Sequence, residues 1–163
     1  MISRQFENLV EFLQQTPERI RVITAGLSEP VVALKNSESE FSILEHVCHL
    51  RDIEAEAYAS RMKRILKEDG PLLPDIDGSR LAIERDYNSQ SLTLALKGFS
   101  QVRALNVETI RNVSEDQLSR KGNLEGVGTI TLWQLLALQR EHDEEHLKEL
   151  SALSHANSGT QND

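Results

Sequence analysis

The sequence predicts an all-α protein that folds as a four-helix bundle. Four long amphipathic stretches carry apolar residues at three-and-four spacing, and polar or Gly- and Pro-containing segments separate them. The chain of 163 residues has only 8 Gly and 4 Pro, and no strand–turn–strand pattern recurs, which argues against a β-barrel or sandwich. We expect one bundle domain over residues 1–153 and a disordered polar tail over residues 154–163.

The first helix is expected over residues 3–26. Pro17 lies inside this stretch and follows Thr16. Because Pro has no backbone N–H, it predicts either a kink in one helix or a second helix start with Thr16 as N-cap. A polar loop is expected over residues 35–40.

The second helix is expected over residues 42–67. Its start is marked by Ser42-Ile43-Leu44-Glu45, a capping box in which the Ser hydroxyl and the Glu carboxylate each satisfy a free backbone N–H. A loop rich in Pro and Gly follows over residues 70–80, and residues 81–85 favour a short helical turn.

The third helix is expected over residues 91–113 and is followed by a polar linker over residues 114–129. The fourth helix opens on Thr131-Leu132-Trp133-Gln134, again a capping-box pattern, and runs to about Leu153.

Composition excludes several classes of protein. The net charge of −8 disfavours binding to nucleic acid, because a negative surface repels phosphate. Cys48 is the single cysteine, so no internal disulfide and no thiolate-rich zinc or iron–sulfur site can form. No apolar run approaches the ~20 residues of a membrane span, and the first residues lack a signal-peptide pattern. These features predict a soluble cytoplasmic protein that binds no membrane.

Two of the five histidines are spaced to share a ligand. His142 and His146 are four residues apart and therefore lie on one face of a helix, near the apolar residues of its core side. Two imidazoles so placed can bind one divalent cation. The alternative interpretation is a pair of core or surface histidines whose nitrogens find other hydrogen-bond partners.

A bound metal needs at least a third ligand, and His46 and His49 of the second helix are the candidates. Apolar periodicity alone slightly favours His46, which lies inside the apolar stripe. His155 falls in the expected tail and is read as a solvated residue.

Two other metal motifs fit the sequence poorly. Zinc peptidases use His-Glu-x-x-His, but Asp143 follows His142 here. Di-iron bundles need Glu-x-x-His on two helices, and Asp143-x-x-His146 is the nearest match in the chain.

Two segments together resemble the DinB/YfiT-like family of metalloenzymes (DinB superfamily). Residues 41–54 read FSILEHVCHLRDIE, which is similar to the family signature of an aromatic residue, Ser, two variable residues, Glu, three further residues and His-Leu-x-Asp-x-Glu. Residues 131–136, followed by His142-x-x-x-His146-Leu147, are similar to the motif of the family's last helix. Phe41 stands where Trp is commoner, and His46 occupies a position that is usually apolar.

The resemblance implies a four-helix bundle, usually a homodimer, with one divalent metal ion held by His49, His142 and His146. It places His49 in register with the family, against the periodicity that favours His46. The family includes transferases and isomerases that use low-molecular-weight thiols, and members known only as metal-dependent hydrolases. The implied substrate is a small electrophile or a hydrolysable molecule, with a low-molecular-weight thiol as co-substrate in the transferase case.

Three neutral imidazoles suit Zn, Ni or Fe and leave coordination positions open, which is typical of catalytic sites. Such a centre can lower the pKa of bound water to about 7 or stabilise a thiolate. Helical spacing makes Glu149, Asp52 and Glu56 the candidate general bases or ligand-orienting groups, unless they are ordinary solvated charges. A non-catalytic metal-stabilised bundle or interaction module is the main alternative, and a metal-free bundle is the other.

Overall fold

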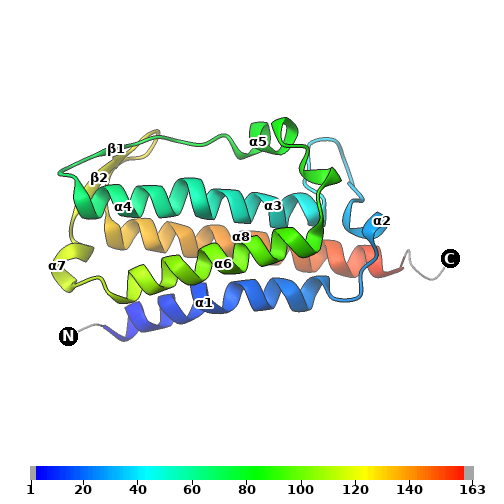
Figure 1. Ribbon diagram of the computed structural model, residues 1–163, viewed down its shortest axis with the longest axis horizontal. Helices are drawn as coiled ribbons and strands as arrows, with labels where there is room; N and C mark the ends of the chain where they lie inside the picture. Colours follow the sequence, from blue (N-terminus) through cyan, green and yellow to red (C-terminus); the bar gives the residue numbers. More distant parts are fainter. Residues whose placement is uncertain (1–2, 160–163) are drawn as a thin grey trace.

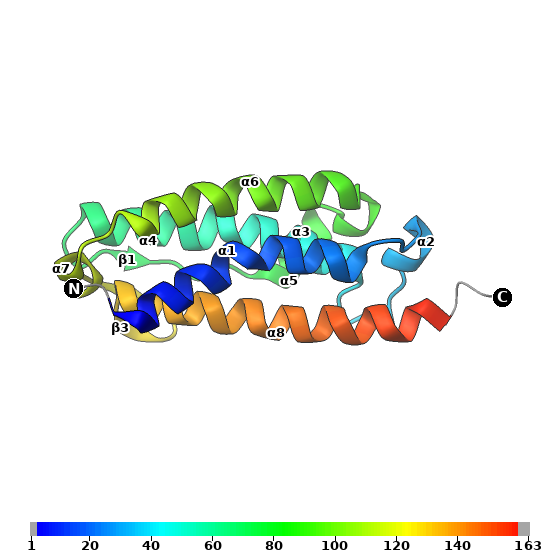
Figure 2. The ribbon, with the colours of Figure 1, turned by 90° about the horizontal axis from the view of Figure 1, so that it is seen from below.

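A computed structural model describes residues 3–159 of the chain and confirms the four-helix bundle (Figures 1 and 2). The long helices are α1 (Arg4–Thr24), α6 (Leu92–Arg111), α8 (Leu132–Ser158) and a composite second helix. The composite helix consists of α3 (Ile43–Ile53), a π-helical turn η1 (Glu54–Tyr58) and α4 (Ala59–Lys67). A π turn inside an α-helix is rare and often marks a functional site.

The first helix continues through Pro17, so of the two interpretations the single helix is correct. Thr16 does not cap a new helix, because its hydroxyl donates to the carbonyl of Phe12 at 3.0 Å. The missing N–H of Pro17 would have bonded the carbonyl of Leu13, four residues earlier. That freed carbonyl instead accepts a hydrogen bond of 2.8 Å from Arg103 on α6.

The second helix begins as predicted. The hydroxyl of Ser42 accepts from the backbone N–H of Glu45 at 3.1 Å, and the Glu45 carboxylate accepts from the N–H of Ser42 at 2.8 Å. The capping box expected at Thr131 is also present, with Gln134 as its partner.

The short helical turn expected over residues 81–85 is present as part of α5, and the other connections hold more structure than the sequence suggested. They contain α2 (Glu29–Val32), α5 (Gly78–Glu84), η2 (Tyr87–Ser89) and α7 (Glu115–Leu118), as well as a three-stranded sheet of β1 (Leu72–Leu73), β2 (Lys121–Leu124) and β3 (Gly128–Thr131).

The expectation of a plain polar linker over residues 114–129 was therefore wrong. Strands β2 and β3 form an antiparallel hairpin, and β1 pairs parallel to β2 at the α4 end of the bundle (Figure 1). Gly126 and Gly128 have φ angles of +77° and +106°, which only Gly adopts easily, so the hairpin turn depends on them.

The last helix also runs further than expected. α8 extends to Ser158, so the predicted disordered tail was wrong for residues 154–158. Tertiary hydrogen bonds hold this end: the Ser154 hydroxyl donates to the carbonyl of Ile23 at 2.9 Å, and Asn157 is buried beside α2. Residues 160–163 of the expected tail lie outside the described residues.

The apolar core is divided into two clusters along the bundle axis. One gathers around the first half of α1 and the first turns of α8, and the other around the end of α1 and the last turns of α8. Buried polar side chains occupy the middle of α6, η1 and α8 between the two clusters; they are Glu54, Arg103, Asn106, Gln139 and Asp143. No helix among the described residues is long and apolar enough to cross a membrane.

Candidate metal centre

Four histidines face one another where α3 packs against α8. His46 and His49 come from α3, and His142 and His146 come from successive turns of α8. The Nε2 atom of His142 lies 3.1 Å from Nε2 of His49 and 3.1 Å from Nε2 of His146. The structure thus brings together the three histidines that the family resemblance indicated, although 93 positions separate the first two in sequence.

The spacing of these three nitrogens fits a metal ion. Two nitrogens that bind one tetrahedral zinc at about 2.05 Å lie about 3.3 Å apart, close to the two measured distances of 3.1 Å. A neutral imidazole has one N–H and one acceptor nitrogen, so three nitrogens that meet at one point cannot all be satisfied by hydrogen bonds among themselves. A divalent cation would satisfy all three.

Burial keeps the imidazoles of His46, His49 and His146 neutral and able to bind a metal. Desolvation lowers the pKa of His49 to about 3 and that of His46 to about 4, and it also holds the pKa of His146 far below its ordinary value. The neighbouring imidazoles add to the effect, because a second positive charge beside the first is unfavourable.

The outer nitrogens of the three rings differ in their surroundings. His146 Nδ1 lies 2.7 Å from Nδ1 of His46, which is hydrogen-bond distance. Among the described residues, Nδ1 of His49 and Nδ1 of His142 are buried without a hydrogen-bond partner. The nearest carboxylate oxygen to the latter, Oδ1 of Asp143, lies 3.9 Å away, too far for a hydrogen bond.

The three carboxylates that the sequence proposed lie at different places. Glu149 lies beside the histidines, with an oxygen 3.2 Å from Nε2 of His46. Asp52 accepts hydrogen bonds from Arg51, Arg85 and Tyr87. Glu56 forms a bidentate ion pair with Arg85. Glu149 is therefore the candidate base that contacts the histidine cluster.

A buried charged network lies behind the histidines, and the sequence did not reveal it. Arg103 binds both oxygens of Asp143, at 2.7 and 3.1 Å, and an oxygen of Glu54 at 2.8 Å. Asn106 and Gln139 donate to the same Glu54 carboxylate. The one available signal was the position of Arg103, four residues after Phe99 on the buried face of α6.

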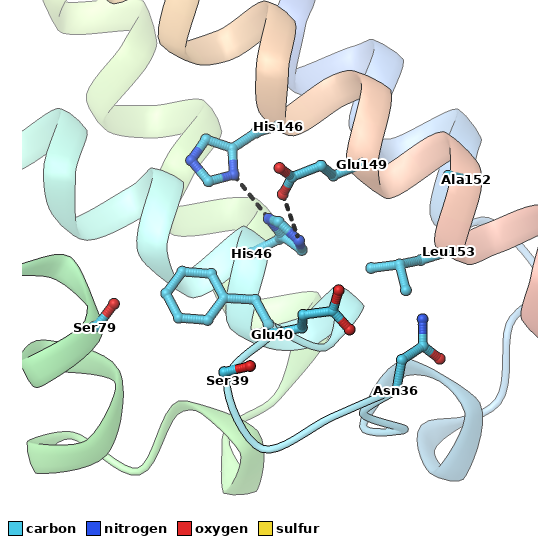
Figure 3. A pocket seen from close by; sticks show the side chains of 10 residues that line it. Asn36, Ser39, Glu40, His46, Ser79, His146, Glu149, Ala152 and Leu153 are labelled. Atoms are coloured by element: carbon cyan, nitrogen blue, oxygen red, sulfur yellow. Dashed lines mark hydrogen bonds and ion pairs between the residues drawn. The ribbon is translucent and has the colours of Figure 1, made fainter.

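A pocket of about 430 Å³ opens beside His46 and His146 (Figure 3). Its wall combines residues of the loop before α3, the start of α5 and the last turns of α8; they are Asn36, Ser39, Glu40, Phe41, His46, Ser79, His146, Glu149, Ala152 and Leu153. A small molecule in this pocket would contact the face of the histidine cluster that carries Glu149.

Comparison with known proteins agrees with this geometry. The sequence model of the DinB superfamily matches residues 13–150, which is most of the chain. The chain belongs to the DinB superfamily. No curated protein matches it significantly.

Among solved structures, the chain is similar to YfiT from Bacillus subtilis, described as a probable metal-dependent hydrolase with an unusual four-helix bundle topology. The two share 18% sequence identity and superpose with a TM-score of 0.87 over 96% of this chain and 90% of YfiT. At this identity the match establishes a common fold. The DinB assignment and the histidine cluster together indicate a metal ion.

Proposed function

We propose that this DinB protein is a divalent-metal-dependent enzyme whose metal is held by His49, His142 and His146. The proposed reaction is hydrolysis or transfer to a low-molecular-weight thiol. The observation that carries the proposal is the convergence of three buried Nε2 atoms, with two spacings of 3.1 Å. When bound, a zinc, nickel or iron ion would supply Lewis acidity for a water or a thiolate at its open positions.

The chain's own residues would supply the remaining chemistry. Glu149 is on the pocket wall, and its carboxylate can take a proton from a group that enters there. Asp52 and Glu56 are held by Arg85, and we assign them to anchoring the segment after α5 against α3 and η1. Phe41 packs against the rings of His46 and His49 and limits the access of water to them.

The pocket also indicates the charge of the substrate. Its wall carries two carboxylates, Glu40 and Glu149, and neither Lys nor Arg. Away from the metal we therefore propose contacts with a neutral or cationic group of the substrate, whereas an anionic group such as a thiolate would lie at the metal. Any thiolate must come from outside the chain, because Cys48 is fully buried and burial raises its pKa to about 11.

Metal binding and thermal stability test the first part of the proposal. Zinc at 100 times its dissociation constant should stabilise the protein by about 2.7 kcal/mol, which corresponds to a rise in Tm of roughly 5–10 °C. His142→Ala should lose the bound metal and this shift, whereas His155→Ala should keep both. Equal zinc content in the wild type and in His142→Ala would rule out the assigned site.

Activity assays separate the reaction classes. An assay with a neutral electrophile and several small thiols detects transferase activity. An assay with neutral ester and amide substrates detects hydrolase activity. Neither activity, combined with a metal that no small ligand can displace, would favour the non-catalytic metal-stabilised bundle. The resemblance also leads us to propose a homodimer, which sedimentation equilibrium would test.

A further inference from the structure

His46 is the buried histidine that the proposed metal set leaves out. It is 3% exposed and lies between His146 and Glu149 (Figure 3). Its Nδ1 is 2.7 Å from Nδ1 of His146, and its Nε2 is 3.2 Å from a carboxylate oxygen of Glu149. Both ring nitrogens of His46 are therefore engaged, one by a histidine and one by a carboxylate.

The short spacing distinguishes a hydrogen bond from shared metal coordination. Nitrogens on one tetrahedral zinc lie about 3.3 Å apart. The His46–His146 distance of 2.7 Å is well below this spacing and is a hydrogen-bond distance, and it joins Nδ1 of His146 rather than the Nε2 that faces His142. His46 and His146 therefore share a proton rather than a cation.

The positions of the protons on Glu149, His46 and His146 follow from which atoms can donate and which can accept. A carboxylate oxygen of Glu149 lies 3.2 Å from Nε2 of His46, and its negative charge favours the tautomer of His46 that carries the proton on Nε2. In a neutral ring Nδ1 of His46 is then an acceptor, so Nδ1 of His146 must be the donor. Nε2 of His146 is left with its lone pair, and this atom faces His142.

We propose that His46, oriented by Glu149, is a positioning residue that holds His146 in the tautomer whose Nε2 lone pair points at the metal. This inference rests on the proposed metal set. Metal-binding histidines almost always donate their other N–H to a partner, and such partners tune metal affinity. Of the three proposed ligands, His146 is the one with such a partner in the described part of the chain.

Zinc affinity of folded variants tests the proposal. His46→Leu removes the Nδ1 acceptor and puts an apolar side chain of similar size in its place. It should weaken zinc binding about 10- to 100-fold. His46→Asn keeps an acceptor, since its amide oxygen is as many bonds from Cβ as Nδ1 of His, and it should restore most of the affinity. Glu149→Ala should weaken binding by less than His46→Leu, and Glu145→Ala, which removes the same charge from the same helix, should change it little.

The tautomer of His146 in metal-free protein is a second measurement, and it does not depend on whether the site binds zinc. Nitrogen chemical shifts should report His146 as the Nδ1–H tautomer in the wild type and in His46→Asn, and a loss of this preference in His46→Leu. Far-UV circular dichroism establishes that each variant is folded.

Three results would overturn the proposal: unchanged zinc affinity in folded His46→Leu, complete loss of zinc in both His46 variants, or an Nε2–H tautomer of His146 in the wild type. The second result would make His46 a ligand itself. A wild-type protein that binds no divalent metal would instead refute the proposed function, and the tautomer measurement would still decide the role of His46.

Discussion

Gly78 lies directly against the imidazole ring of His49. A Cβ placed on residue 78 would lie 2.4 Å from Cε1 and 2.7 Å from Nδ1 of that ring. Gly78 is the first residue of α5, and the side chain of Asp77 caps this helix by accepting from the N–H of Arg80. The backbone of α5 therefore sets how far the His49 ring can tilt away from α8.

Gly78→Ala should displace the His49 ring and weaken zinc binding on the order of tenfold, because a ligand moved by several tenths of an ångström no longer fits the metal. Isothermal titration with zinc measures the effect. Ser79→Ala, at the next and exposed position of the same helix, should bind zinc like the wild type. Wild-type affinity in Gly78→Ala would show that the ring has room to move or does not bind metal.

Arg103→Met should strongly destabilise the protein. It leaves the buried carboxylates of Glu54 and Asp143 without their cation, and removing one partner of a buried ion pair costs about 3–5 kcal/mol. Urea unfolding followed by circular dichroism gives the difference. Arg21→Ala breaks an ion pair with Glu18 whose side chains are mostly exposed, and it should hardly move the urea midpoint.

The stability of the protein should fall in acid partly through Asp52. Burial acts to raise the pKa of this carboxyl, but hydrogen bonds from Arg51, Tyr87 and Arg85 outweigh it, and the pKa lies below its ordinary value. The unfolded chain then takes up the proton first, near pH 4, so this stabilisation is present above pH 4 and is lost as the pH falls through the folded pKa. The gap in unfolding free energy between wild type and Asp52→Asn should narrow from pH 6 to pH 2. A constant gap would mean that the ionised form of Asp52 is not preferred by the fold.

Cys48 should resist alkylation in the folded protein. Its side chain is fully buried, its pKa is raised to about 11, and only the thiolate reacts with iodoacetamide. Mass spectrometry should detect little adduct at pH 7.5 without urea and full labelling in urea. Fast labelling of folded protein would show that this segment opens readily.

The four long helices were predictable because their apolar spacing and capping boxes are local signals. The sheet was not, because its strands are only two to four residues long and β1 pairs with a segment about 50 positions away. The end of α8 was missed for a related reason. Ser154 and Asn157 are small polar residues typical of a disordered tail. In the structure their side chains donate hydrogen bonds to carbonyls of α1 and α2.

The candidate site was predictable only in part. Four-residue spacing identified His142 and His146 as a pair. Apolar periodicity slightly favoured His46 over His49 as the third ligand, but both rings face α8, and the difference lies in which ring atoms meet. Residue type alone does not identify the buried face of α6: Leu105 is 64% exposed, whereas Arg103 is 1% exposed, because its hydrogen-bond partners come from three other helices.

Arg103 joins all four long helices at one point. From α6 it reaches the Leu13 carbonyl of α1, Glu54 of the π turn and Asp143 of α8. Two carboxylates and one guanidinium sealed in a protein interior tolerate single replacements poorly but can be exchanged as a set for apolar residues. In the evolution of this lineage, we therefore expect Arg103, Glu54 and Asp143 to be replaced together. The Leu13 carbonyl that Pro17 leaves free would then lose its hydrogen-bond donor.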